Sequence, residues 1–288
     1  MSFESAAQPS PTCVAGTSGI GLRFPHLTDL LEVRPDIGLL EVHTENLFCL
    51  APAVQRRIER LRADYAFSLH GVGLSLGSAQ GVDETHLQRW ADTVARYQPA
   101  LISEHLSWNR VQEVSLPDLL PLPMASEALD VVARNVERTQ EAIGREIAIE
   151  NISAYLRYGA DEMSEAEFLS RLVARTGCRL LVDVNNLHVN RLNLGEDPLA
   201  FLQSVPSDAV AEFHLAGPTR VGDSWIDTHA APVPEAVWNL FEAALQAIGP
   251  RPTVVEWDQD LPALAVLLAE AKRADRYLDA ARQNSCAA

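Results

Sequence analysis

The chain has 288 residues, of which 47% are hydrophobic and 22% are charged, and its formal net charge is -16. This composition is typical of a globular protein with a sizeable core, and it excludes a disordered or collagen-like chain. Because the negative charge repels phosphate backbones and anionic lipids, we expect no nucleic-acid partner and no membrane partner.

The ends of the chain predict its organisation. The first seventeen residues have neither the basic segment nor the apolar segment of a signal peptide. No later stretch reaches the roughly 18 apolar residues that a membrane span needs. We therefore expect a cytoplasmic protein with a disordered tail at residues 1–16, one domain over residues 17–283 and a second tail at residues 284–288.

The four cysteines are Cys13, Cys49, Cys178 and Cys286. They lack the paired spacing of a zinc ribbon, and a chain of this length does not need a disulfide framework. We expect Cys49 and Cys178 to be buried packing residues, which fits a reducing compartment.

Eight short aliphatic runs predict strands. In chain order they are residues 19–23, 38–43, 65–70, 100–105, 146–150, 179–183, 210–215 and 252–256. Helical periodicity separates them, as at 125–143 and at 165–176, where Ser164-Glu-Ala-Glu167 has the form of a capping box. Eight such alternations predict an α/β protein, a single-domain (β/α)8 TIM barrel. A doubly wound open sheet is disfavoured because no strand precedes a phosphate-binding glycine motif.

Metal-binding residue types stand where the predicted strands end. They are His43, His70, Glu104 with His105, Glu150 with Asn151, Asp183, His214 and Glu256, and Asp227 with His229 in the loop after the seventh strand. One such residue is more often a packing residue than a ligand. Seven strands that end in this way predict a site, because the catalytic groups of a TIM barrel lie at the carboxyl ends of its strands.

Charge indicates what this site binds. Glu150, Asp183, Asp227 and Glu256 would meet at the barrel mouth, and two carboxylates about 5 Å apart repel by roughly 3 kcal/mol at an effective dielectric constant near 20. No lysine stands at these strand ends, and Arg23 alone cannot balance four acids, so bound metal is the expected counter-charge. The nitrogen and oxygen donors favour iron, manganese or zinc, and spacing does not choose among them.

Seven motifs carry a resemblance to a known family. They are HGVGLSLG at 70–77, SEHLSW at 103–108, ENIS at 150–153, DVNN at 183–186, HLAG at 214–217, DTH at 227–229 and VEWD at 255–258. Together they resemble the DUF692 family of multinuclear non-heme iron-dependent oxidative enzymes, which includes the methanobactin biosynthesis oxygenase. Members are TIM barrels, similar to xylose isomerases and apurinic endonucleases, that modify cysteines of ribosomally made precursor peptides, usually with a partner protein that presents the peptide.

The resemblance implies an iron- and O2-dependent oxidation of peptidyl cysteine in RiPP biosynthesis, with two to three iron ions of mixed Fe(II)/Fe(III) valence and with O2 as co-substrate. It also implies that Glu150, Asp183 and His214 are catalytic. The implied ligands are His70, His105 and a bridging Glu150 for the first ion; Glu150, Asp183, His214 and Glu256 for the second; and Asn186, Asp227 and His229 for the third.

Some roles stay open at this stage. His188 competes with Asn186 for the third ion, and Arg23 either grips a substrate carboxylate or pairs with a barrel acid. Residues expected to orient ligands or to line the pocket are His43, Ser103, Glu104, Trp108 and Asn151; Asn185 and Asn190 are expected to hold the loop.

Other functions remain as alternatives. A metal-dependent phosphodiesterase of the apurinic endonuclease type would use nearly the same ligands, but the net charge of -16 opposes DNA binding. A divalent-metal sugar isomerase would need a catalytic lysine or a histidine pair near the sugar, and no lysine is suitably placed. A peptide-binding module without catalysis would hold no metal.

Overall fold

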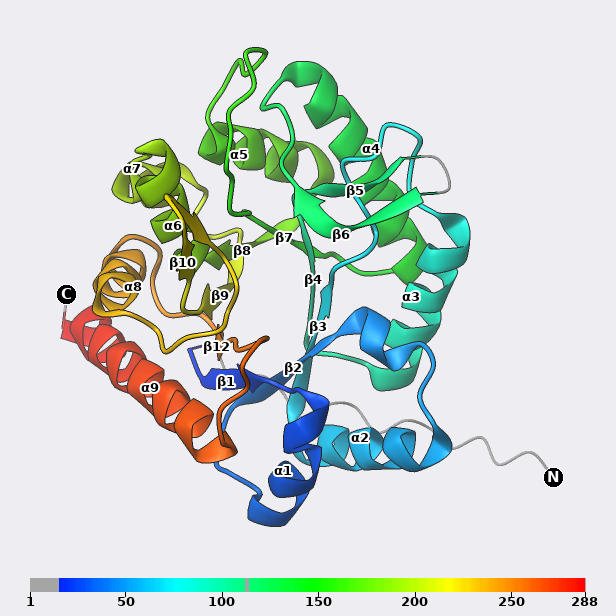
Figure 1. Cartoon of the computed structure of the whole chain (residues 1–288), viewed down its shortest axis with the longest axis vertical. Coiled ribbons are helices and arrows are strands. Elements are labelled where there is room, and N and C mark those ends of the chain that lie inside the picture. The colour runs from blue at the N-terminus through cyan, green and yellow to red at the C-terminus, as the bar shows by residue number, and fades with distance from the viewer. Residues whose placement is uncertain (1–15, 112–113, 288) are drawn as a thin grey trace.

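The computed structural model describes residues 16–111 and 114–287. Its centre is a closed barrel of eight parallel strands, which confirms the predicted fold (Figure 1). Around the barrel the strands follow the order β1-β12-β9-β8-β7-β4-β3-β2. Their bounds are β1 Ser18–Gly21, β2 Leu39–His43, β3 Ala66–Gly71, β4 Leu101–His105, β7 Ala148–Glu150, β8 Arg179–Asp183, β9 Val210–Leu215 and β12 Thr253–Val255.

Helices surround the barrel and cover the outer faces of its strands (Figure 1). They are α1 Leu27–Val33, α2 Pro52–Asp64, α3 Glu84–Tyr97, α4 Ser126–Ile143, α5 Glu165–Thr176, α6 Val184–Leu194, α7 Pro198–Ser204, α8 Glu235–Ile248 and α9 Leu264–Ala287, with short 3-10 turns at Phe24–His26 and Thr44–Leu47. The N-cap of the predicted capping box is confirmed, because the Ser164 side chain accepts the backbone N–H of Glu167, whereas the Glu167 side chain pairs with Arg171.

The barrel interior is built in layers, because alternate residues of each strand point inward. Strand pairing places Leu39 beside Ala66, then Glu41 beside Ser68, then His43 beside His70. Leu39 and Ala66 pack with Val254 in a small apolar cluster, so the bottom layer is an ordinary core. The two layers above it are polar.

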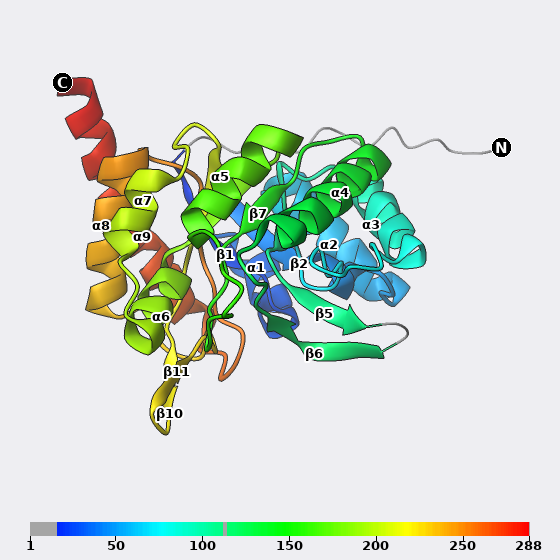
Figure 2. The same cartoon turned by 90° about the horizontal axis from the view of Figure 1, so that it is seen from above.

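Two hairpins that the strand pattern does not predict lie at one end of the barrel (Figure 2). One pairs β5 Trp108–Val111 with β6 Val114–Leu120, and the other pairs β10 Thr219–Val221 with β11 Ser224–Ile226. They follow β4 and β9, so they flank the mouth formed by the carboxyl ends of the strands. Short exposed strands of this kind lack the buried aliphatic run on which the prediction depended.

Two predictions need correction. The expected tail at 284–288 is helical as far as Ala287, because α9 is anchored through buried Leu278 and partly buried Ala281 and continues at little cost beyond them. Cys49 is exposed, whereas Cys178 is buried as predicted. Cys49 lies in the connection after the Thr44–Leu47 turn, where Leu47 takes the buried position.

Residues 1–15 of the predicted N-terminal tail lie outside the described residues. In the described parts of the chain, no helix is long and apolar enough to cross a membrane.

Candidate metal centre

Strand register brings the predicted ligands to one level. His105 on β4 lies beside Glu150 on β7, and Asp183 on β8 lies beside His214 on β9. Glu256 directly follows β12. All five are buried, so the barrel mouth gathers three carboxylates and two imidazoles away from water.

The first group consists of His70, His105 and Glu150. The Nε2 atoms of both histidines lie 3.2 Å from Glu150 Oε2 and 3.3 Å from each other. Ligands about 2.1 Å from a tetrahedral ion would be separated by roughly 3.4 Å, so these three atoms are spaced as a metal would require. The other ring nitrogens are held from behind: Nδ1 of His105 donates to the Gly71 carbonyl at 2.9 Å, and Nδ1 of His70 lies 2.8 Å from Ser103 Oγ.

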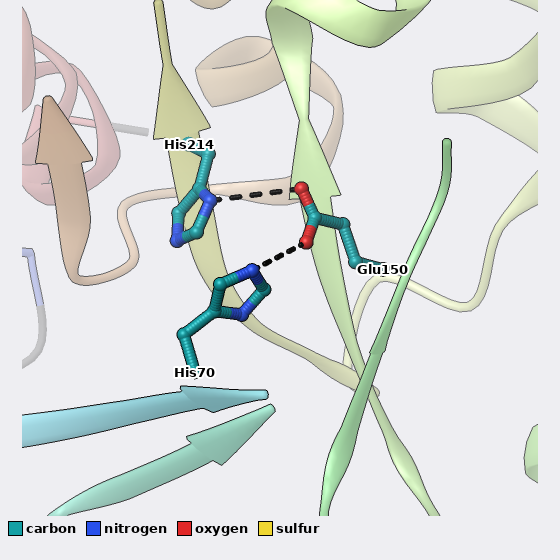
Figure 3. Close-up of side chains that lie close together, drawn as sticks. All are labelled: His70, Glu150 and His214. Atoms are coloured by element: carbon teal, nitrogen blue, oxygen red, sulfur yellow. Dashed lines mark ion pairs between the residues drawn. The ribbon is translucent and has the colours of Figure 1, made fainter. Parts of the chain in front are cut away.

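The second group uses the other oxygen of Glu150. Glu150 Oε1 lies 3.6 Å from His214 Nδ1, which lies 2.8 Å from Glu256 Oε2. Together with Asp183, these side chains place ligand atoms within 4.8 Å of one another. Figure 3 shows the Glu150 carboxylate between the rings of His70 and His214, with one oxygen directed at each. This is the arrangement of a bridging ligand.

The layer beneath these groups was missed by the sequence analysis. Glu41 Oε2 lies 2.9 Å from His214 Nε2, and Ser68 donates to Glu212 at 3.1 Å. A carboxylate behind a histidine fixes its tautomer, so that Nδ1 of His214 faces the second group. The signal was present in Glu41-Val-His43 and Glu212-Phe-His214, because residues two apart on a strand point to the same side.

The third group lies nearer the surface and is carried by loops. His229 Nε2 is 2.7 Å from Asp227 Oδ1 and 3.9 Å from Asp183 Oδ2. Asn185 donates to Asp227 Oδ1 at 2.6 Å. Asn186 sits in the first turn of α6, where its backbone N–H donates to Asp183 Oδ1 at 2.7 Å and its Nδ2 donates to the Asn151 carbonyl at 3.0 Å. These bonds leave the Asn186 amide oxygen free to bind a cation.

Unpartnered buried atoms test whether a metal fits. Among the described residues, buried atoms that make no hydrogen bond of good geometry include Glu150 Oε2, Asp183 Oδ2, Asn186 Oδ1, His214 Nδ1 and His229 Nε2. Three of them, Glu150 Oε2, His214 Nδ1 and His229 Nε2, nevertheless lie within 3.2 Å of an ion-pair partner. Buried polar atoms are rarely left unpaired, because each one costs free energy. Five of them at the predicted ligand positions fit metal ions, and the only lysine of the chain is Lys272, in α9.

The pKa shifts of Asp183, His214 and His229 also indicate that the site needs positive charge. Burial raises the pKa of Asp183 well above its usual value, and the charges of Asp227 and Glu150 add to this shift. Burial opposes charge on His214, yet Glu256 and Glu41 raise its pKa well above the ordinary range. Burial likewise opposes charge on His229, yet Asp227 and Glu256 raise its pKa. Metal ions would displace these protons, so metal affinity should fall as the pH falls.

The remaining predicted residues have these contacts. Asn151 clamps the Asp183 backbone, accepting its N–H at 2.9 Å and donating to its carbonyl at 3.1 Å. Glu104 accepts the backbone N–H groups of His105 and Leu74 at 2.9 and 3.0 Å. Both therefore hold in place the backbone of residues in the proposed groups; their role in orienting metal ligands stays a prediction. Asn190 holds the loop as expected, bonding the backbone of Ala154 and Ile152.

The structure narrows the roles that the sequence left open for Arg23 and His188. Arg23 pairs with Glu256 and Asp258, both acids of this barrel, and its Nη2 lies 3.1 Å from His43. His188 is half-buried on α6, and within the described residues no hydrogen bond or ion pair joins it to the third group. Trp108 lies at the base of β5 and donates to the Pro121 carbonyl at 3.0 Å; its place in the pocket wall stays a prediction.

A cavity of about 590 Å³ opens above the three groups of candidate ligands. Its lining includes His105, Asn186, Asp227 and Asp258 together with the stretch 116–119 of β6 and 226–228 at the end of β11. The first hairpin thus lines the cavity through β6, and the second reaches it through Ile226 at the end of β11.

Comparison with known proteins identifies relatives of the whole chain. Residues 17–279 match the family described as RiPP precursor modification enzyme MbnB/TglH/ChrH. The UPF0276 protein of Chromobacterium violaceum is 46% identical over 276 residues, which cover 96% of this chain and 100% of that protein. The UPF0276 protein of Vibrio parahaemolyticus is 44% identical over 264 residues, covering 90% and 92%.

Solved structures share the fold at low identity. D-psicose 3-epimerase from Clostridium cellulolyticum H10 superposes with a TM-score of 0.56 at 12% identity, covering 93% of this chain and 98% of that one. A D-tagatose 3-epimerase-like protein gives a TM-score of 0.60 at 13% identity, covering 93% and 99%. These likenesses concern the barrel architecture alone.

Proposed function

Because the chain belongs to the MbnB/TglH/ChrH family of RiPP precursor modification enzymes, we propose that it oxidises cysteine residues of a ribosomally made precursor peptide with iron and O2. The observation that carries this proposal is the position of Glu150, which directs one carboxylate oxygen at each of two groups of nitrogen and oxygen donors. Such a bridge places two ions close enough to act on one substrate.

The residues that would hold the ions are those of the three groups. They are His70, His105 and Glu150; Glu150, Asp183, His214 and Glu256; and Asn186, Asp227 and His229. Bound iron supplies electron transfer and the activation of O2. The protein's part is to keep histidines in the tautomer that offers the free nitrogen: the Gly71 carbonyl does this for His105, and Glu41 does it for His214. The Ser103 hydroxyl bonds Nδ1 of His70 and orients that ring.

Any thiolate ligand of the proposed ions would have to come from the substrate. Among the described residues, Cys49 and Cys178 both lie outside the three groups. Cys178 is buried in the hydrophobic core, and Cys49 is exposed after the Thr44–Leu47 turn. Histidine and carboxylate sites with open positions suit oxygen-dependent iron chemistry. A peptidyl cysteine that enters the cavity would complete the donor set with its thiolate.

The route to the site suits an extended peptide. The cavity is lined in part by residues of both hairpins, and its carboxylates, with the net charge of -16, oppose a nucleic-acid substrate. We further propose that a partner protein presents the peptide to this opening, and that the reaction takes place in the cytoplasm, where precursor peptides are synthesised.

The test is a reaction with any short cysteine-bearing peptide that the open reading frames neighbouring this gene encode. Aerobically purified protein should contain two to three iron ions per chain and should change the mass of that peptide only when iron and O2 are present. The matched controls are the peptide with each Cys→Ser and the enzyme variant Glu150→Gln, which should both leave the mass unchanged. Activity restored by zinc alone would contradict the proposal, as would micromolar binding of abasic DNA at physiological salt without binding of the peptide.

A further inference from the structure

Arg23 is a buried cation beside the proposed ligands. It follows β1, its residue surface is only 7% exposed, and its Nε donates to Asp258 Oδ1 at 2.6 Å. Its Nη2 also pairs with Asp258 and lies 3.4 Å from Glu256 Oε1. The guanidinium therefore joins two carboxylates and has its closest contacts with Asp258.

The guanidinium occupies a place that could otherwise hold a metal ion. His43, Glu256 and Asp258 offer ligand atoms that all lie within 4.8 Å of one another, and Nη2 of Arg23 is within 3.1 to 3.4 Å of His43 Nε2 and Glu256 Oε1. Gly21 leaves room for it, because a Cβ there would come within 2.9 Å of Arg23 Nη1. Arg23 is thus a fixed internal cation, and its guanidinium nitrogens already contact Asp258 and Glu256.

Asp258 connects this cation to a proposed ligand. Its Oδ2 accepts from His229 Nδ1 at 3.0 Å, and its backbone N–H donates to the His229 carbonyl at 2.8 Å. His229 has a φ of 48°, which is unusual for a residue with a side chain. A carboxylate behind a histidine fixes the ring so that the opposite nitrogen, here Nε2, faces the metal.

We infer that Arg23 is a positioning residue for the third metal ion, acting through Asp258 on His229. This inference rests on the proposed metal centre. Arg23 holds the Asp258 carboxylate with its planar fork, Asp258 holds Nδ1–H of His229, and Nε2 of His229 is thereby aimed at Asp227 and Asp183. Nε and Nη2 of Arg23 both approach Oδ1 of Asp258, which leaves Oδ2 for His229.

The experiment is an anaerobic titration of the metal-free protein with ⁵⁷Fe(II), with stoichiometry and Mössbauer spectra as readouts. Arg23→Met should lower the affinity of the third ion by about 10 to 100-fold and leave the other two bound. The control is Arg62→Met, which removes another buried arginine that donates to the Tyr97 carbonyl away from the mouth; it should bind iron like the wild type. Three ions at wild-type affinity in Arg23→Met would overturn the inference.

A second pair of variants separates positioning from general destabilisation. Asp258→Asn should weaken the third ion by a similar factor, and the double variant Arg23→Met/Asp258→Asn should be no weaker than the worse single variant, because both lie on one path. Multiplicative losses would show that Arg23 does not act through Asp258. If Arg23→Met does not fold, Arg23→Lys replaces it in the cycle. A wild type that binds no third ion refutes the proposed centre itself, whereas loss of the predicted difference refutes only the role of Arg23.

Discussion

The inner and outer parts of the candidate centre are built differently. His70, His105 and His214 stand on barrel strands, where the ladder of neighbouring strands fixes their backbone. Asp227 and His229 stand in the loop after β11 and depend on side-chain bonds from Asn185 and Asp258. The inner groups are therefore positioned by the fold, and the outer group by individual hydrogen bonds.

This difference predicts how the two parts respond to change. A ligand on a strand keeps its place when a neighbour is altered, because many backbone bonds hold it. A ligand on a loop moves when one supporting bond is lost. The outer ion should accordingly be the one that is first lost and most variable in occupancy.

The largest effect is expected for Glu150→Gln, which removes the charge that both inner groups share. Both inner ions should be lost or bound in altered sites, and activity on the peptide should disappear. Iron per chain and the Mössbauer spectrum measure this result. Glu165→Gln, which alters a buried carboxyl outside the three groups, should keep its iron; retention of both inner ions in Glu150→Gln would contradict the bridge.

The next effect is expected for His229→Ala, which should lower iron content by about one ion per chain. The pair bridged by Glu150 should keep its spectroscopic signature, because its ligands lie on strands or, for Glu256, directly after one. His86→Ala is the control, since His86 bonds Glu45 outside the three groups. If His229→Ala empties the inner pair as well, the two parts are not independent and the comparison fails.

A buried acid that has no metal nearby gives the converse test. Burial raises the pKa of Glu165 to about 7, so the folded protein retains this proton as the pH rises above 4.5 while the unfolded chain loses it. Stability is therefore lost between about pH 4.5 and 7, and Glu165→Gln should be more stabilising at pH 8 than at pH 5 by on the order of 2 kcal/mol. Urea unfolding at both pH values measures this difference, and equal effects would refute it.

A smaller effect is expected for Asn185→Ala. Without the amide that donates to Asp227 Oδ1, the outer ion should bind about 10-fold more weakly while remaining detectable at saturating iron. Asn193→Ala is the control, because Asn193 lies on the same helix and, among the described residues, its side chain bonds the Trp225 backbone and not Asp227. Iron titration distinguishes the two variants, and equal affinities would show that Asp227 needs no support.

The smallest effect is expected for His188→Ala, which should leave iron content unchanged, because within the described residues this half-buried side chain has no bond to the third group. Asn186→Ala should lower iron content by about one ion. If His188→Ala empties a site and Asn186→Ala leaves every site filled, His188 takes the place of Asn186.

The sequence predicted the barrel and the place of the inner groups because both depend on local patterns. An aliphatic run marks a buried strand, and a histidine or an acid at its end marks the mouth. Glu41 was missed because an acid within an aliphatic run resembles an interruption, although its contact with His214 lies across the barrel. Asn185 was expected to hold its loop, but its bond to Asp227 depends on how two distant loops meet, and no spacing encodes that. The hairpins were missed because their strands are short and exposed.

The cavity above the candidate ligands limits how the proposed peptide substrate could be handled. A volume of about 590 Å³ is that of an ordinary small-molecule pocket, so it admits only a few residues of a peptide at once. A precursor with several cysteines must then release and reload for each one. If the precursor peptide stays bound at a second site during this exchange, its high effective concentration favours repeated turnover on the same peptide. Without such a second site, the enzyme would be distributive, and partly modified peptides would accumulate.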